Sequence, residues 1–263
     1  MIINQITKGS GVTPTGTITI TNNGVTDVTN YASADVQVPT TAPALYREFQ
    51  LDANGVLVPN TTTTHIIDFT GMTNVSDYAL SKAYYGNTAI SGAVDMSDLT
   101  TVSGTYACHQ MFYGCTGLTS FDLSALITVS GQSGCFGMLS RCTRLISANL
   151  PALTTISGNS GCGYMFDGCT GLTSANLSGI TAITGTSACV GMFYGCTSLA
   201  TVYIGGTTAI DFETRTNVFN SMFTGCTQNI DVYAPAANQA QIEAFSGYPN
   251  FGGTGNVVWH WRS

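Results

Sequence analysis

The sequence predicts an α/β solenoid in which a unit of about 27 residues, with one strand and one short helix, is repeated along an axis. Cysteines recur in steps of 27, for example Cys115 and Cys142. The stretch MFYGCTGLTSFDL at 111–123 returns in similar form at 165–177 and 192–204. Within each unit, the apolar residues follow first a helical spacing and then a strand spacing. Such units expose an apolar side when alone, so the prediction is a continuous stack.

The helix is predicted from apolar residues at positions i, i+3, i+4 and i+7. In one unit these positions are Cys108, Met111, Phe112 and Cys115. Phe219 replaces the first cysteine in the last unit, so the position accepts any hydrophobic residue. The same spacing occurs over residues 80–87, 135–142, 162–169, 189–196 and 219–226.

The strand is predicted from the spacing L-x-x-L-x-L, which is typical of leucine-rich repeats and which Leu118, Phe121 and Leu123 show first. A third segment, with Val129 and its equivalents, closes each coil. Side chains between the inward positions point outward and form the candidate binding face. These residues are Ser120, Asp122, Ser147, Asn149, Ser174, Asn176, Thr201, Tyr203, Asp231 and Tyr233.

The repeats resemble the BspA-type leucine-rich repeats of bacterial and protist surface proteins over roughly residues 67–255. The stretches that carry the resemblance are MFYGCTGLTSFDL, MLSRCTRLISANL, MFDGCTGLTSANL, MFYGCTSLATVYI and MFTGCTQNIDVYA. Arrays of this family tend to close with a strand, a proline and a short helix, and residues 231–251 are similar to such an ending. The units here are a few residues longer than is typical of the family.

Residues 1–66 do not share the repeat. The stretch GTITITNNGVTDVTNYASADVQVP predicts strands around a turn at Asn23 and Gly24. It resembles a β-module of tail-associated and structural proteins of bacteriophages and prophages. The predicted organisation is a β-rich attachment module at 1–45, a linker and N-terminal cap at 46–66, the repeat solenoid at 67–234, and a C-terminal cap at 235–263.

The cysteines are predicted to form a structural core ladder of buried free thiols. Zinc sites need ligands that converge from different segments, whereas C-x6-C on one helix face gives parallel rows. Disulfides between adjacent turns are an alternative, but they require an oxidising compartment. The ladder consists of Cys108, Cys115, Cys135, Cys142, Cys162, Cys169, Cys189, Cys196 and Cys226.

Composition and charge exclude several functions. Charged residues make up 8% of the chain and its net charge is −7, without a basic stripe to neutralise phosphates, so nucleic acid is not an expected partner. No stretch reaches 18 apolar residues and the N-terminus lacks a signal-peptide core, so we expect neither membrane insertion nor export on this sequence alone.

No catalytic motif is visible. The three histidines, His65, His109 and His260, are far apart and share no metal or triad spacing. No nucleophile elbow, phosphate-binding loop or zinc-protease motif occurs. The sequence therefore predicts a protein that is not an enzyme and that uses no cofactor or metal.

Two features of the candidate face point to ligands. Asp68, Asp95, Asp122, Asn149 and Asn176 are predicted to stack in one column at about 4.8 Å spacing. Three carboxylates there could hold Ca²⁺, although a solvated acidic row is the favoured interpretation.

The same column continues as Tyr203 and Tyr233, with Trp259 and Trp261 nearby in sequence. Exposed aromatic residues on a concave sheet can bind sugars or partner loops. Alternatively, the segment VVWHW is a closing strand whose tryptophans cover the last repeat.

Two functions follow as expectations. The first is a non-enzymatic phage or prophage virion component, such as a tail, fibre or capsid-decorating protein, assembled in the host cytoplasm. Its N-terminal module would bind other virion proteins and its repeats a bacterial surface protein or glycan. The alternative is a BspA-like adhesin at the bacterial cell surface. A homo-oligomer is compatible with the sequence, which specifies no number of chains.

Overall fold

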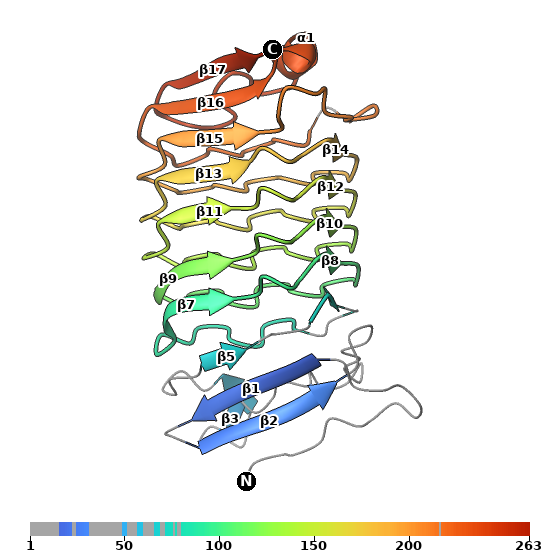
Figure 1. Cartoon of the computed structure of the whole chain (residues 1–263). Coiled ribbons are helices and arrows are strands. Elements are labelled where there is room, and N and C mark those ends of the chain that lie inside the picture. Colours follow the sequence, from blue (N-terminus) through green and yellow to red (C-terminus); the bar gives the residue numbers. More distant parts are fainter. Residues whose placement is uncertain are drawn as a thin grey trace.

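The structure is a computed structural model of the 263-residue chain. It describes the backbone of five N-terminal strands and residues 72–75, 77, 80–215 and 217–263. The repeats form a parallel β-solenoid, with turns stacked along one axis (Figure 1), which confirms the predicted solenoid.

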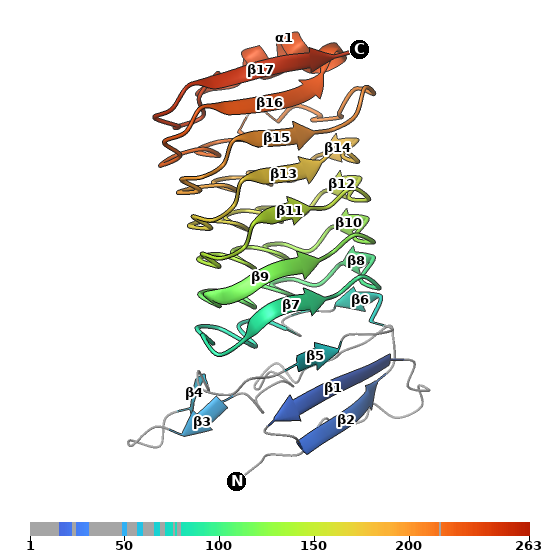
Figure 2. The same cartoon turned by 60° about the vertical axis from the view of Figure 1, so that its left-hand side comes forward.

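Strands of the L-x-x-L-x-L motif line one side of the stack, seen face-on in Figure 2. We call their outward surface the strand face. Residues one repeat apart lie opposite each other, as Asn149 and Asn176 do, then Asn176 and Tyr203. The strands are β7 (Ser91–Asp95), β9 (Gly117–Asp122), β11 (Ser147–Asn149), β13 (Ser174–Leu177), β15 (Thr201–Ile204), β16 (Ile230–Pro235) and β17 (Val257–Arg262).

A second sheet of two-residue strands closes each coil. All its pairs are parallel, and each strand buries its second residue, as Val129 and Ile156 do. Between the sheets, threonine hydroxyls bond to the preceding turn, for example Thr154 Oγ1 to the Ile127 carbonyl at 3.2 Å. The strands are β6 (Asn74–Val75), β8 (Thr101–Val102), β10 (Thr128–Val129), β12 (Thr155–Ile156) and β14 (Ala182–Ile183).

The predicted helix of each unit is wrong. The amide of Gln110 donates to the carbonyl oxygen of Phe136 in the next turn at 2.8 Å, while the amide of Met111 donates to the Cys108 carbonyl oxygen three residues back at 3.2 Å. This alternation continues along each segment and binds it to its neighbours. We call these segments the turn ribbon; they span residues 80–86, 106–115, 133–142, 160–169, 187–196 and 217–226.

The turn ribbon has a backbone period of four residues. Tyr106, Gln110 and Gly114 have φ values of 53°, 51° and 73°. A right-handed helix has negative φ throughout and amides that donate four residues back. The spacing i, i+3, i+4, i+7 fits both a helix and a four-residue repeat, so the apolar pattern could not separate them. Glycines such as Gly137 and Gly168, unfavourable inside a helix, were the signal against it.

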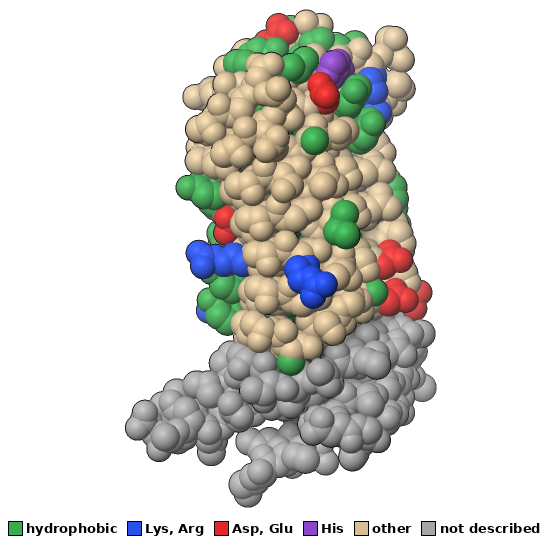
Figure 3. All heavy atoms as spheres, turned by 90° about the vertical axis from the view of Figure 1, so that its left-hand side faces the viewer, with side chains coloured by type: hydrophobic (Ala, Val, Ile, Leu, Met, Phe, Trp, Pro, Cys, Tyr) green, Lys and Arg blue, Asp and Glu red, His purple; other side chains and the backbone are tan. Residues whose placement is uncertain are grey.

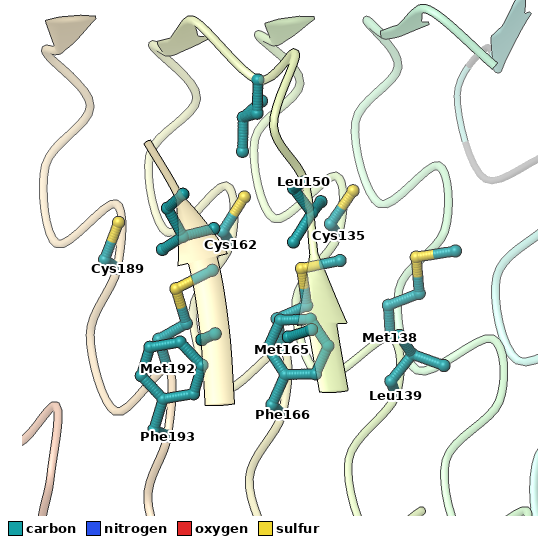
Figure 4. Packing of buried hydrophobic residues seen from close by; sticks show 14 of the residues in the cluster. Cys135, Met138, Leu139, Leu150, Cys162, Met165, Phe166, Cys189, Met192 and Phe193 are labelled. Carbon is teal, nitrogen blue, oxygen red and sulfur yellow. The ribbon is translucent and has the colours of Figure 1, made fainter. Parts of the chain in front are cut away.

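The core lies between the turn ribbon and the two sheets. Its rows run along the axis with one member per turn: a cysteine row, a methionine row, and a row of Phe or Leu (Figure 4). Cys162, Met165 and Phe166, from one turn, are all 0–1% exposed. This stacking of like on like accounts for the sequence repeat, because each row must fit identical neighbours.

The two ends of the stack differ. The hairpin of β1 (Gly16–Asn22) and β2 (Val25–Tyr31) pairs through β1 with β5 (Ile66–Asp68), which pairs with β7. The hairpin thus extends the repeat sheet. The two-stranded sheet of β3 (Phe49–Leu51) and β4 (Leu57–Pro59) lies between them in the chain. The predicted turn at Asn23 and Gly24, and the rest of the attachment module, linker and cap, lie outside the described residues.

At the C-terminal end, β16 runs into the 3-10 helix η2 (Ala236–Asn238) and α1 (Gln239–Glu243), the one α-helix of the described residues. Strand β17 then completes the sheet beside β16. Trp259 and Trp261 pack against the core, which is the closing role considered for them. No described helix has the length and apolar character needed to cross a membrane.

Candidate binding site

The strand face carries a hollow of about 500 Å³ toward its C-terminal end. It crosses β11, β13 and β15 and is closed on one side by a residue of β17. Its volume lies in the range of small-ligand sites. The residues that line it are Ser147, Ala148, Asn149, Ser174, Ala175, Asn176, Ser178, Tyr203 and Arg262.

The C-terminal wall of the hollow is an aromatic ring with a cation over it. The guanidinium of Arg262 lies 5.5 Å from the ring centroid of Tyr203. Its Nη2 donates to the carbonyl oxygen of Gly205, 57 residues earlier in the chain. Arg262 is in register with Pro235 of β16, so its side chain reaches across that strand to β15. The two contacts fix the guanidinium at the edge of the hollow.

An aromatic stack supports this wall from behind. Tyr203 stacks on Tyr233 with centroids 4.8 Å apart, and Tyr233 stacks on His260 at 4.6 Å. His260 Nε2 lies 2.7 Å from the Asp231 carboxylate. Because each ring sits on the next strand of one column, parallel register alone brings them together. The stack holds Tyr203 in one orientation.

The remaining lining is small and uncharged. Ala148 and Ala175 are buried and form an apolar base, where other units place bulkier residues such as Phe121 and Val202. Asn176 Nδ2 donates to Asn149 Oδ1 at 3.1 Å, and Asn176 Oδ1 accepts the amide of Ser178 at 3.1 Å. Hydroxyl and amide groups therefore line the hollow, and no carboxylate is among them.

The carboxylates of the acidic column, Asp95 and Asp122, lie nearer the N-terminal end of the strand face and accept hydrogen bonds from the turns that follow their strands. The amide of Ser97 donates to Asp95 at 2.9 Å, and the amide of Ser124 donates to Asp122 at 2.8 Å. Hydrogen bonds from Ser97 lower the pKa of Asp95. Within the described residues no group of three or more His, Cys, Asp or Glu side chains could hold a metal ion. The carboxylates cap local turns, as Asp and Asn do at strand ends.

The predicted face residues fall into two groups. The structure exposes all ten at least partly. In Figure 3, which views the side where the strands begin, charged side chains are few and scattered. The hollow brings together Ser147, Asn149, Ser174, Asn176 and Tyr203, but it does not include Ser120, Asp122, Thr201, Asp231 or Tyr233.

Arg262 was missed by sequence reasoning. Its contact with the hollow depends on β17 lying beside β16 and on a side chain that crosses a strand. The alternation of Val258, His260 and Arg262 in the closing strand was the available signal, since it places all three on the outer side.

The nine cysteines are buried free thiols, apart from the hollow. Burial raises the pKa of Cys115, Cys169 and Cys189 to about 12. Hydrogen bonds from the neighbouring thiols of Cys108 and Cys162 lower the pKa of Cys135 below its ordinary value, whereas the pKa values of those two thiols are raised. The eight thiols whose pKa is raised stay protonated at neutral pH and act as small hydrophobic residues.

The turn ribbon carries a second set of aromatic side chains. Tyr85 and Tyr113 stack with centroids 4.6 Å apart, and the guanidinium of Arg141 lies 5.3 Å from the Tyr113 centroid. His109 stacks on Phe136 at 5.6 Å, and burial lowers its pKa. These rings pack against each other on the turn ribbon.

Together, these features define a parallel β-solenoid whose strand face carries a hollow lined by an aromatic ring, a cation and neutral hydrogen-bonding groups over an apolar base. Among solved structures, the chain is similar to a leucine-rich repeat protein from Bacteroides ovatus. The two are 12% identical, the alignment covers 81% of this chain and 75% of that protein, and the TM-score is 0.22. No family model and no curated protein matches the sequence. The fold class thus rests on the strand registers themselves.

Proposed function

We propose that this chain is a non-enzymatic recognition protein that binds a saccharide through the hollow of the strand face. The observation that carries the proposal is the combination of the Tyr203 ring with neutral side chains of Ser147, Ser174, Asn149 and Asn176 around one cavity. Aromatic rings pack against the C–H faces of sugars, and amides and hydroxyls pair with sugar hydroxyls. The side chains are held before the ligand arrives, which reduces the entropic cost of binding.

We also propose the assembly to which the protein belongs. The β1–β2 hairpin lies at the N-terminal end of the stack (Figure 1), whereas the hollow crosses β11, β13 and β15 farther along it, so attachment and recognition can take place at separate parts of the molecule. This arrangement suits a virion component that contacts its particle through the hairpin and a host through the repeats. A bacterial surface adhesin of the BspA type is the second candidate, favoured by the resemblance of the repeats.

The experiment is a binding assay of the full chain to whole bacteria and to a panel of purified bacterial surface saccharides. We expect binding by the wild type and loss of at least about tenfold in affinity for Tyr203→Ala, because the wall of the hollow is removed. Tyr113→Ala, on the turn ribbon, is the matched control and should bind as the wild type does. Equal binding by Tyr203→Ala would contradict the proposal. Detecting the chain in purified phage particles, or on intact cells, separates the virion from the adhesin.

A further inference from the structure

The hollow carries a positive charge, whereas the chain as a whole is negatively charged. The protein carries 14 acidic and 7 basic residues, for a net charge of −7. Yet the one charged side chain that lines the hollow is the guanidinium of Arg262. The neighbouring carboxylate of Asp231 lies 2.7 Å from His260 and is not part of the lining. A positive centre in an acidic protein favours an anionic ligand at this position.

Arg262 also has unused hydrogen-bonding capacity. Its Nη2 donates to the Gly205 carbonyl oxygen, whereas its buried Nε has no hydrogen-bond partner. The buried Nε is closed to a ligand, so pairing takes place at the part of Arg262 that lines the hollow, where a ligand oxygen gains a charge-assisted hydrogen bond. The planar guanidinium suits a carboxylate in particular, because its N–H groups match the two oxygens.

We infer that the hollow takes an acidic saccharide whose carboxylate pairs with Arg262 while its ring packs against the Tyr203 wall. The inference rests on the proposed saccharide-binding function and specifies its ligand class. Asn149, Asn176 and the serine hydroxyls then pair with the neutral hydroxyls of the same ligand. Arg262 supplies the discrimination between acidic and neutral sugars, and Tyr203 supplies affinity for both.

The test uses calorimetric titration of the full chain with oligogalacturonate and with the same oligosaccharide after reduction of its carboxyl groups to hydroxymethyl groups. We expect the acidic form to bind the wild type roughly 10- to 100-fold more tightly, as charged hydrogen bonds do relative to neutral ones. Arg262→Gln should remove this difference, and Arg262→Lys should keep part of it. Tyr203→Ala should weaken both ligands. Thermal unfolding of each variant checks that it is folded.

The outcomes separate the two proposals. Equal binding of both oligosaccharides by the wild type overturns the acidic-ligand inference and leaves saccharide recognition standing. Equal weakening of both by Arg262→Gln overturns it too, because Arg262 would then be only a structural residue. Failure of both to bind overturns the acidic-ligand inference, while the proposed function is decided by the saccharide panel. Poly(glycerol phosphate) offers the charge without a sugar ring, and tighter binding of this polymer would assign the hollow to a phosphate ligand and overturn the inference.

Discussion

The thiol of Cys169 donates a hydrogen bond to the carbonyl oxygen of Leu139 in the preceding turn, with 3.1 Å between sulfur and oxygen. Cys115, Cys142, Cys196 and Cys226 make the same contact at 3.0–3.2 Å. One residue type thus fills the narrow space inside the turn ribbon and links each turn to the last. The contact explains why cysteine, and no larger hydrophobic residue, recurs at this position.

Removing one member of this row should cost a modest part of the stability. Cys169→Ala leaves a small cavity and removes a weak donor, so the free energy of unfolding should fall by about 1–2 kcal/mol. Cys169→Asp buries a carboxylate without a partner and should prevent the neighbouring turns from folding. Urea unfolding followed by circular dichroism measures both. An aspartate variant as stable as the wild type would show that this face of the core is open to water.

The buried thiols also predict instability in alkali. The folded pKa values of all these thiols except Cys135 are raised, to about 12 for Cys115, Cys169 and Cys189, whereas an unfolded cysteine has a pKa of about 8.5. The unfolded chain therefore releases these protons first as the pH rises. Below about pH 8.5, these protonated thiols contribute fully to the free energy of unfolding. As the pH rises from there to 12, the free energy of unfolding falls by roughly 1.4 kcal/mol per pH unit for each thiol. The midpoint of urea unfolding at pH 8 and pH 10.5 measures this loss, and Cys189→Ala should reduce it by one thiol.

At a column of glycines, adjacent turns approach each other too closely to admit a side chain. A Cβ atom on Gly158 would lie 2.1 Å from the carbonyl oxygen of Gly131 in the preceding turn. Gly158→Ala should thus lower the free energy of unfolding by at least about 2 kcal/mol, because backbone must shift. Gly206→Ala is the control, since its Cβ would meet its nearest atom at 3.5 Å and should change stability by less than about 1 kcal/mol. Equal effects in the two variants would contradict the observed approach of the turns.

The turn ribbon predicts a stabilising glycine. Ser160 has a φ of 50°, a conformation that costs a non-glycine residue about 1–2 kcal/mol. Ser160→Gly removes this strain and should raise the free energy of unfolding by about 0.5–1 kcal/mol after the entropy of the added glycine is counted. Ser157→Gly, where φ is not positive, should instead lower it by a similar amount. If both substitutions destabilised the protein, the left-handed backbone at Ser160 would be wrong.

Sequence reasoning predicted the register of the fold but not the conformation of one of its three sides. The 27-residue step placed Asn149 beside Asn176 and Tyr203, since equivalent residues in adjacent turns must pair. The turn ribbon was mistaken for a helix because Cys108, Met111, Phe112 and Cys115 have the same spacing in both. Hydrogen bonds between turns, such as Gln110 to Phe136, depend on the stacking, and no single unit reveals them.

Sequence reasoning predicted five of the nine residues that line the hollow. Outward alternation along each strand identified Asn176 and Tyr203, because a strand turns every second side chain to the same face. The alternation did not predict the hollow itself or its limit at Tyr203. The hollow depends on the small side chains of Ala148 and Ala175, and its limit depends on Arg262, which reaches it from the closing strand. Those features arise from packing across several turns.

The measurement that tests the central claim most directly maps the binding face in solution. Backbone and side-chain NMR shifts of the full chain are recorded with and without oligogalacturonate. Binding through the hollow predicts the largest changes at Asn149, Asn176 and Tyr203, with Tyr85 and Tyr113 on the turn ribbon unchanged. Shifts confined to the two turn-ribbon tyrosines would contradict the assignment of recognition to the strand face.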